Sequence, residues 1–192
     1  VTVAQANAIG ALTSAAVTAT VAAGNAATLN QTLLSDGGGN AYKLTVNGTS
    51  EPAINLNALD AKTTVNVNVA AVETITGNES DVTTLYTNSA NFTGLGNETV
   101  TISDSVSAAQ ANTIALATTG AVTATIVDAA TAVALNTALT DTTVNEYALK
   151  ITDTNLTSLT NLIALDGKSG TAAIDASSLL SISETYANLN TA

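Results

Sequence analysis

The chain contains an internal duplication, which is the feature that most restricts how it can fold. Gln5 recurs as Gln110, and the segment AVTAT at Ala16–Thr20 recurs at Ala121–Thr125. The shift between the two copies is 110 − 5 = 105 residues. A chain that repeats itself in this way is expected to fold as an array of similar units that pack on their neighbours.

A shorter period runs inside each copy. Alternating apolar and polar residues, as in Ala16–Val21, predict strands, and apolar residues at helical spacing, as in Ala111–Ala115, predict short helices. The first three predicted strands centre near Ala19, Leu44 and Val67, which are 44 − 19 = 25 and 67 − 44 = 23 residues apart. This spacing lies within the range of about 20–29 residues that is typical of leucine-rich repeats.

Strands that are joined by helices are expected to be parallel, because a hairpin cannot contain a helix. The sequence therefore predicts an α/β repeat solenoid, with a parallel β-sheet on one face and short helices on the other. We expect residues 1–104 to form a first super-repeat of about four coils and residues 105–192 a second, truncated one, in one continuous solenoid. A right-handed parallel β-helix without helices is the alternative, because the helical stripes are short and rich in Thr.

The composition limits the partners that the chain can bind. It is 192 residues long, 46% hydrophobic but only 10% charged, and it carries a net charge of −11 with four Lys and Arg residues in all. Nucleic acid and anionic membrane surfaces are disfavoured, because both require a basic patch. No membrane insertion is expected, since the most apolar window, Ala121–Leu135, is shorter than the roughly 20 residues that span a bilayer.

The absence of Cys and His bears on location and on chemistry. A chain without Cys cannot form disulfides, and among secreted proteins this favours a bacterial or archaeal surface. The chain begins at Val1, which suggests a processed product or a fragment. Without His or Cys, acid–base catalysis would require paired Asp and Glu residues, and the glutamates recur at no shared repeat position. We therefore expect a protein that is not an enzyme.

Four aspartates lie at or just after the ends of predicted strands, namely Asp104, Asp128, Asp153 and Asp175. Stacked at equivalent turns, their carboxylates would be candidate calcium ligands between coils. The simpler interpretation is that each aspartate caps the helix that follows it, because capping requires no second ligand. Capping is the favoured interpretation, with no cofactor, and calcium is the alternative.

The polar faces of the predicted strands carry Thr and Asn, as in Thr18 and Thr20, Asn66 and Asn68. Stacked in a sheet, they would form a flat surface that is either solvated or covered by a partner. A glycan is a further candidate partner. It is disfavoured, however, because sugar rings usually stack on aromatic side chains, which make up only 3% of the chain.

The segment Ile151–Leu180 and the motif VTATIVD at Val122–Asp128 resemble the Thr-, Ala- and Val-rich arrays of large secreted and surface proteins of aquatic bacteria. The resemblance covers nearly the whole chain, but it is a similarity of composition and residue pattern. It assigns a function to no individual residue of this chain. It implies an extracellular, repetitive protein with a structural or adhesive role.

These observations predict an extracellular structural protein that assembles with like chains into a surface layer, filament or adhesin stalk. An open repeat array leaves strand edges and apolar layers exposed at its ends unless they are capped. The C-terminal segment Tyr186–Ala192 is short for such a cap. A calcium-dependent adhesion module or a carbohydrate-binding module is the alternative function.

Overall fold

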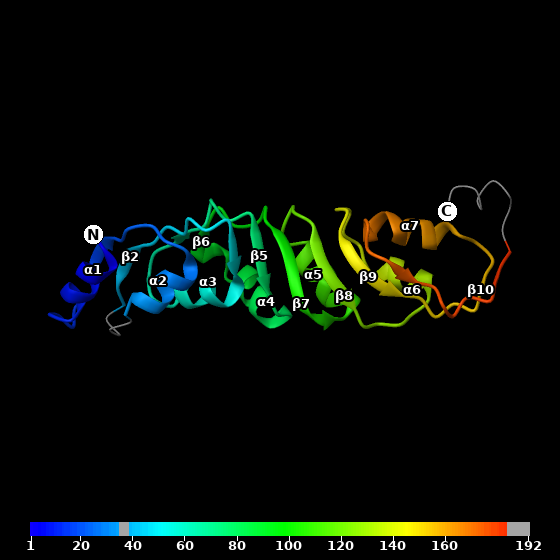
Figure 1. The fold of residues 1–192 in the computed structure, drawn as a ribbon, viewed down its shortest axis with the longest axis horizontal. Coiled ribbons are helices and arrows are strands. Elements are labelled where there is room, and N and C mark those ends of the chain that lie inside the picture. Colours follow the sequence, from blue (N-terminus) through cyan, green and yellow to red (C-terminus); the bar gives the residue numbers. More distant parts are fainter. Residues whose placement is uncertain (35–38, 184–192) are drawn as a thin grey trace. The chain divides into compact units, whose positions relative to one another are not determined.

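The structure, a computed structural model, describes residues 1–34 and 39–183 (Figure 1). The chain divides into two compact units, Val1–Val100 and Thr101–Ala192, each of which is described by itself. The end of the first super-repeat at residue 104 stays a prediction. The expected C-terminal segment Tyr186–Ala192 lies outside the described residues.

The first unit alternates short helices with short strands. Its elements are α1 (Val3–Gly10), β1 (Thr18–Thr20), α2 (Ala26–Thr32), β2 (Ala41–Lys43), β3 (Ser50–Pro52), α3 (Ala53–Asp60), β4 (Val67–Asn68), β5 (Thr74–Gly77), α4 (Glu79–Thr87), the 3₁₀ helix η1 (Ser89–Asn91) and β6 (Phe92–Thr93). The strand β7 (Thr99–Val106) begins in this unit and continues into the second.

The second unit has the same alternation. After β7 its elements are α5 (Ala108–Ala115), β8 (Val122–Ile126), α6 (Ala132–Ala138), β9 (Glu146–Lys150), β10 (Asn155–Leu156), α7 (Thr160–Ser169), β11 (Ile174–Asp175) and β12 (Ser181–Ile182). In both units the helices are separated by one or two strands, and the paired strands are parallel, so the protein is of the α/β class. The seven α-helices of the described residues distinguish it from a β-helix made of strands alone.

The paired strands are parallel, and the register between them is nearly constant. In the first unit Thr18 of β1 lies opposite Ala41 of β2, 41 − 18 = 23 residues further on. In the second unit Thr123 of β8 lies opposite Glu146 of β9, again 146 − 123 = 23 residues further on. The pairs β3–β5, β4–β6, β9–β11 and β10–β12 are parallel as well. The segment between two parallel strands therefore carries the chain back, so that the second strand begins at the same end of the sheet as the first.

The core of each unit consists mainly of aliphatic side chains from successive helices and strands, with a few buried aromatic rings such as Tyr42 and Tyr147. Leu29, Leu56 and Leu85 come from α2, α3 and α4 and are at most 2% exposed. Full burial of a leucine side chain stabilises a fold by about 1.5–3 kcal/mol. The helices α2, α3 and α4 that supply these leucines contact one another in sequence order.

The same hydroxyl–glutamine pair starts the first helix of each sequence repeat. The Thr2 hydroxyl accepts a hydrogen bond from the backbone N–H of Gln5, and the Gln5 side chain accepts one from the backbone N–H of Thr2. Ser107 and Gln110 form the same reciprocal pair at α5. This capping box satisfies backbone donors that the helix itself leaves without partners.

The structure corrects one part of the predicted fold. The sequence predicted one strand in each coil and therefore a single sheet. In the structure several coils have a second strand, as in β3, β5, β10 and β12, so that more than one sheet is present. These strands are two to four residues long and include Ser50–Pro52, a segment without alternating hydrophobicity. These short strands form because they pair with another strand further along the chain. Such pairing produces no alternating pattern in the local sequence from which a strand could be predicted.

Among the described residues, no helix has both the length and the apolar character needed to cross a bilayer.

Candidate functional site

Asp128 and Asp153 each bind the start of a helix in the second unit. The Oδ2 atom of Asp128 accepts a hydrogen bond of 2.8 Å from the backbone N–H of Ala108, the first residue of α5. The Oδ2 atom of Asp153 accepts one of 2.7 Å from the backbone N–H of Ala132, the first residue of α6. The first N–H groups of a helix have no partner within it, and the helix dipole favours a negative charge there.

The helix that each carboxylate binds precedes it in the sequence. These two hydrogen bonds reach back 20 and 21 residues, to the helix of the previous coil. The sequence pattern predicts instead that each aspartate caps the helix that follows it. Glu51 does the same in the first unit, where its Oε1 atom accepts a hydrogen bond of 3.0 Å from the backbone N–H of Ala26 in α2. The carboxylates therefore join segments that lie 20, 21 and 25 residues apart in the sequence.

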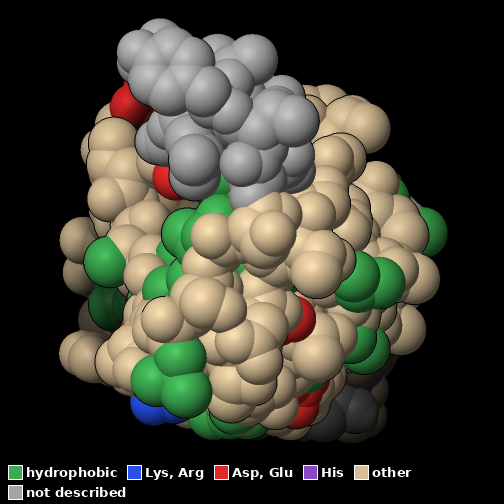
Figure 2. Space-filling model, turned by 90° about the vertical axis from the view of Figure 1, so that its right-hand side faces the viewer, with side chains coloured by type: hydrophobic (Ala, Val, Ile, Leu, Met, Phe, Trp, Pro, Cys, Tyr) green, Lys and Arg blue, Asp and Glu red, His purple; other side chains and the backbone are tan. Residues whose placement is uncertain are grey.

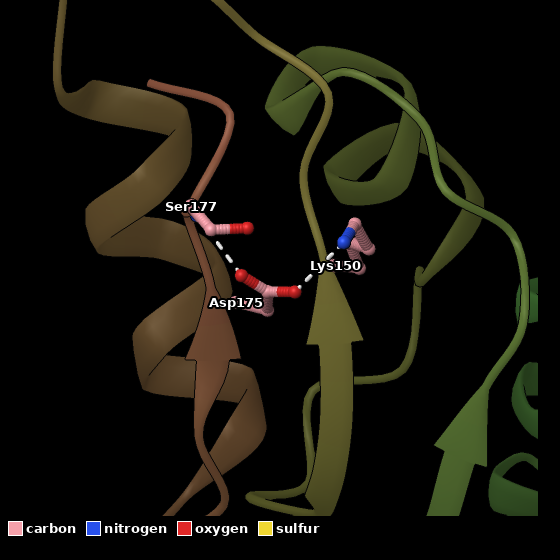
Figure 3. Close-up of polar contacts among 3 residues, drawn as sticks. All are labelled: Lys150, Asp175 and Ser177. Carbon is pink, nitrogen blue, oxygen red and sulfur yellow. Dashed lines mark hydrogen bonds and ion pairs between the residues drawn. The ribbon is translucent and has the colours of Figure 1, made fainter. Parts of the chain in front are cut away.

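Asp175 has a different environment, at the surface of the second unit (Figure 3). Its Oδ2 atom lies 2.9 Å from the Lys150 ammonium, and its Oδ1 atom accepts a hydrogen bond of 2.9 Å from the backbone N–H of Ser177. Hydrogen bonds from Ser177 and then from Lys150 hold the pKa of Asp175 below its ordinary value of 3.8. The carboxylate bridges β9 and the turn after β11.

Asp104 lies on an exposed part of β7. Of the four predicted aspartates, the structure thus places two at helix starts, one in a surface ion pair and one on a strand. Within residues 1–34 and 39–183, no three carboxylates gather in the way that a metal site requires. Calcium binding at these positions stays a prediction.

A polar pocket of about 180 Å³ lies in the first unit, lined by Asp60, Thr63, Thr64, Val65, Asn66 and Asn91. The Nδ2 atom of Asn91 donates to the Asp60 carboxylate at 3.0 Å, and the Thr63 hydroxyl donates to the backbone carbonyl of Tyr42 at 2.7 Å. The pocket contains oxygen atoms that suit sugar hydroxyls, but no aromatic ring lines it. Several of its polar groups already have partners within the chain.

Asparagine side chains join segments that lie 25 to 28 residues apart, which is a further role that no local sequence pattern predicts. The Asn7 side chain donates to the carbonyl of Thr32 at 2.8 Å and accepts from the backbone N–H of Leu34 at 3.0 Å. Its counterpart in the second repeat, Asn112, accepts from the backbone N–H of Thr140 at 2.7 Å. The 105-residue shift could have revealed this role, because it retains Asn at both positions.

Two lysines have an equivalent structural role. The Lys62 ammonium donates to the carbonyl of Leu33, the residue that ends α2. The Lys168 ammonium donates to the carbonyl of Leu139, the residue that ends α6. Both cations therefore neutralise the negative end of the preceding helix. Two of the four basic residues are thus engaged within the fold and are not part of a basic surface.

The outer edge of β1 is the best candidate for an interaction site. On the inner edge, the carbonyl of Val17 accepts from the backbone N–H of Ala41, and the backbone N–H of Val21 donates to the carbonyl of Lys43. In a parallel strand alternate residues direct their N–H and C=O groups to opposite edges, so Thr18 directs its groups outward. Among the described residues, β1 pairs with β2 alone.

Val1 occupies one position of this outer edge. Its ammonium group donates to the carbonyl of Thr20 at 2.7 Å, and its carbonyl accepts from the backbone N–H of Ala22 at 2.8 Å. In the second repeat the carbonyl of Val106 accepts from the backbone N–H of Val127 at 2.9 Å. Val106 and Val127 are each 105 residues beyond Val1 and Ala22. Val1 is therefore the structural counterpart of the last residue of β7.

One apolar residue of α1 is more exposed than its counterpart in α5. Ile9 of α1 is 44% exposed, whereas Ile114 of α5, its counterpart at the 105-residue shift, is 1% exposed. Leu12 is 88% exposed. Ile9 is thus exposed at a repeat position that is buried in the second unit.

Exposed apolar residues also occur near the last strands of the second unit, at Leu180 and Ile182. Figure 2 shows a face of the molecule on which separate hydrophobic side chains lie among uncharged polar groups and backbone, with few charged side chains. Because this surface carries few charges, it repels an approaching chain less than a highly charged surface would.

No family model matches the chain, and comparison with curated proteins and with solved structures gives no match either.

Proposed function

We propose that the protein is an extracellular structural protein, built as one α/β repeat solenoid, that assembles with like chains into a surface layer, filament or adhesin stalk. Its role in this proposal is mechanical, and it is not an enzyme. The solenoid consists of two super-repeats, residues 1–104 and residues 105–192.

Contacts that recur at the repeat spacing support the solenoid. The Asn40 side chain accepts a hydrogen bond from the backbone N–H of Val17, and the Asn145 side chain accepts one from the backbone N–H of Val122, each across 23 residues. Both members of the second pair lie 105 residues beyond those of the first. A bond between neighbouring coils that recurs at the same repeat position is expected of a stack of equivalent coils.

The observation that carries the assembly proposal is that, among the described residues, β1 pairs with β2 alone, together with the exposed Ile9 and Leu12 in the segment before β1. An unprotected strand edge is a template for pairing with another chain. A monomer usually blocks such an edge with lysine, proline or a covering loop, and β1 contains neither lysine nor proline. When one surface meets a different surface of the next copy, the contact propagates into a fibre or lattice.

Analytical ultracentrifugation and negative-stain electron microscopy of the concentrated protein test this proposal. We expect sedimentation to rise with concentration and filaments or sheets to appear. The variant Thr18→Pro removes an N–H that points to the open edge and should reduce association. Thr18→Val keeps the N–H and is the matched control. Monomers alone at every concentration, with Thr18→Pro unchanged from the parent, would contradict the proposal.

A second candidate function is a calcium-dependent adhesion or carbohydrate-binding module, which the polar pocket at Asp60 favours. Ligand binding to the folded state raises Tm by mass action. Thermal unfolding in millimolar calcium and in chelator, followed by a glycan array, tests this candidate. Asp60→Asn is the matched variant for either ligand. An unchanged Tm together with an array without hits would eliminate this function.

A further inference from the structure

We propose that Asn47 is a site of spontaneous covalent modification in the folded protein, where the asparagine converts into aspartate and isoaspartate. The proposal is independent of the assembly function. Asn47 belongs to the only Asn–Gly pair in the sequence, Asn47–Gly48, and asparagine is a thermolabile residue. In this reaction a backbone nitrogen attacks the side-chain amide of the residue before it. Glycine hinders that attack least, because it has no side chain.

The reaction requires only the chain itself and water. The Gly48 nitrogen bonds to the Cγ atom of Asn47, the bond from Cγ to the side-chain nitrogen breaks, and that nitrogen leaves with the Gly48 proton as ammonia. Water then opens the cyclic succinimide that has formed. Opening at Cγ leaves aspartate, and opening at the backbone carbonyl carbon leaves isoaspartate. Both products gain a carboxylate, and in isoaspartate the backbone is also one carbon longer.

The structure leaves both reacting groups accessible. Asn47 is exposed and lies between the bridge residue Val46 and the start of β3, outside any helix or strand. Its own N–H donates to the carbonyl of Gly24 at 3.1 Å. Among the described residues, however, no backbone carbonyl accepts from the Gly48 N–H. The nitrogen that must attack is therefore not held in a backbone hydrogen bond.

Packing requires glycine at position 48. A Cβ there would lie 2.0 Å from the Oε1 atom of Glu51. The same Oε1 atom accepts the hydrogen bond from the N–H of Ala26 at the start of α2, and Glu51 is 2% exposed. A larger residue at position 48 would displace this carboxylate from its partner. The contact that starts α2 therefore keeps beside Asn47 the residue that makes it reactive.

Asp166–Gly167 is an acidic counterpart in a different environment. Aspartate can form the same succinimide by loss of water, so this pair could also yield isoaspartate. It lies within α7, however, where the backbone N–H groups are engaged in the helical ladder. We therefore expect isoaspartate at Asn47 and not at Asp166.

The isoaspartate form should destabilise the first unit. The segment is anchored on both sides, because the Asn47 N–H donates to Gly24 and the carbonyl of Thr49 accepts from the N–H groups of Glu73 and Thr74 at 2.8 and 3.0 Å. An extra backbone carbon between these anchors changes the spacing that their hydrogen bonds require. We expect Tm of the isoaspartate form to fall by about 2–4 °C, which is the shift that a modest loss of stability gives in a chain of this size.

The test incubates the purified full chain in heavy-oxygen water at pH 6 and at pH 9, followed by digestion at acidic pH and mass spectrometry. The fraction modified at Asn47 should rise with time, and faster at pH 9, because attack requires loss of the Gly48 proton. The internal controls in the same digest are Asn97 and Asn155, which are exposed but precede no glycine. Asp166 is the internal control for isoaspartate.

Asn47→Gln is the matched variant, because its longer side chain forms the corresponding ring much more slowly. Its mass and Tm should stay constant during the same incubation. Asn47→Asp carries the new charge on a backbone of normal length and should keep the Tm of the fresh parent chain. Modification of Asn47 that occurs only in urea, or no faster than at Asn97, would overturn the proposal. A Tm unchanged in the isoaspartate form would refute the loss of stability in the first unit.

Discussion

The carboxylate of Asp153 lies 2.7 Å from the backbone nitrogen of Ala132, although 21 residues separate them in the sequence. Ala132 is the first residue of α6, so its N–H has no partner within the helix. The contact therefore joins one coil to the start of the helix in the coil before it. Asp128 and Glu51 make the same type of contact at α5 and α2.

We predict that Asp153→Ala lowers the free energy of unfolding by about 0.5–2 kcal/mol, as expected for the loss of a helix-start acceptor. Asp153→Asn retains an acceptor oxygen without the charge and should cost less. Urea unfolding followed by circular dichroism measures both. Equal losses in the two variants would show that charge, and not the hydrogen bond, determines the contribution of Asp153.

The lysines that end helices give a second prediction. Lys168→Met should leave the carbonyl of Leu139, the C-cap residue of α6, without the ammonium group that donates to it. We expect this change to lower the free energy of unfolding by about 1–3 kcal/mol. Lys62→Met is the equivalent change in the first unit. Lys150→Met is the matched control, because its ion pair with Asp175 is exposed and should contribute little. A control as destabilised as Lys168→Met would contradict this assignment.

Periodicity predicted the parts of the fold that depend on local pattern. The alternation at Val122–Ile126 identified β8, whose buried and exposed residues alternate as expected. Apolar spacing likewise identified α5. The α/β class is therefore readable from the sequence, because each of these segments buries one face and the period of that face differs between helix and strand.

The sequence did not reveal features that depend on the next coil. Strands such as β3 and β12 are too short to show a period. The four aspartates look alike in the sequence, yet Asp153 binds a helix start whereas Asp175 forms an ion pair with Lys150. The partner in each case lies 21 or 25 residues away, and local propensity carries no information about it.

Gly94 should be the glycine of the first unit that is least tolerant of substitution. Its φ is +86°, and a Cβ there would lie 2.7 Å from the Cα atom of Ala70. Since the obstacle is backbone, Gly94→Ala should destabilise the fold by more than the roughly 1–2 kcal/mol of a left-handed residue alone. Gly167→Ala is the control, because a Cβ there meets nothing within 4 Å and the residue lies in α7. Thermal unfolding should show a lower Tm for the first variant and an equal or higher one for the second.

Tyr147 provides a prediction about alkaline pH. Its side chain is 1% exposed, and its hydroxyl has no hydrogen-bond partner among the described residues. Burial, and then the charge of Asp141, raise the pKa of Tyr147 above its ordinary value of 10.0. A pKa that is higher in the folded state means that the contribution of Tyr147 is fully present below pH 10 and is lost as pH rises toward the folded-state pKa.

Tyr147→Phe should therefore retain its stability further into the alkaline range than the parent chain. At neutral pH the variant should be as stable or more so, since it removes a buried hydroxyl without a partner. Urea unfolding at pH 7 and at pH 11 measures both effects. Spectroscopic titration of tyrosinate should show one fewer late-titrating group in the variant. A variant that loses stability at pH 7 would mean that the Tyr147 hydroxyl does have a partner, such as a buried water molecule.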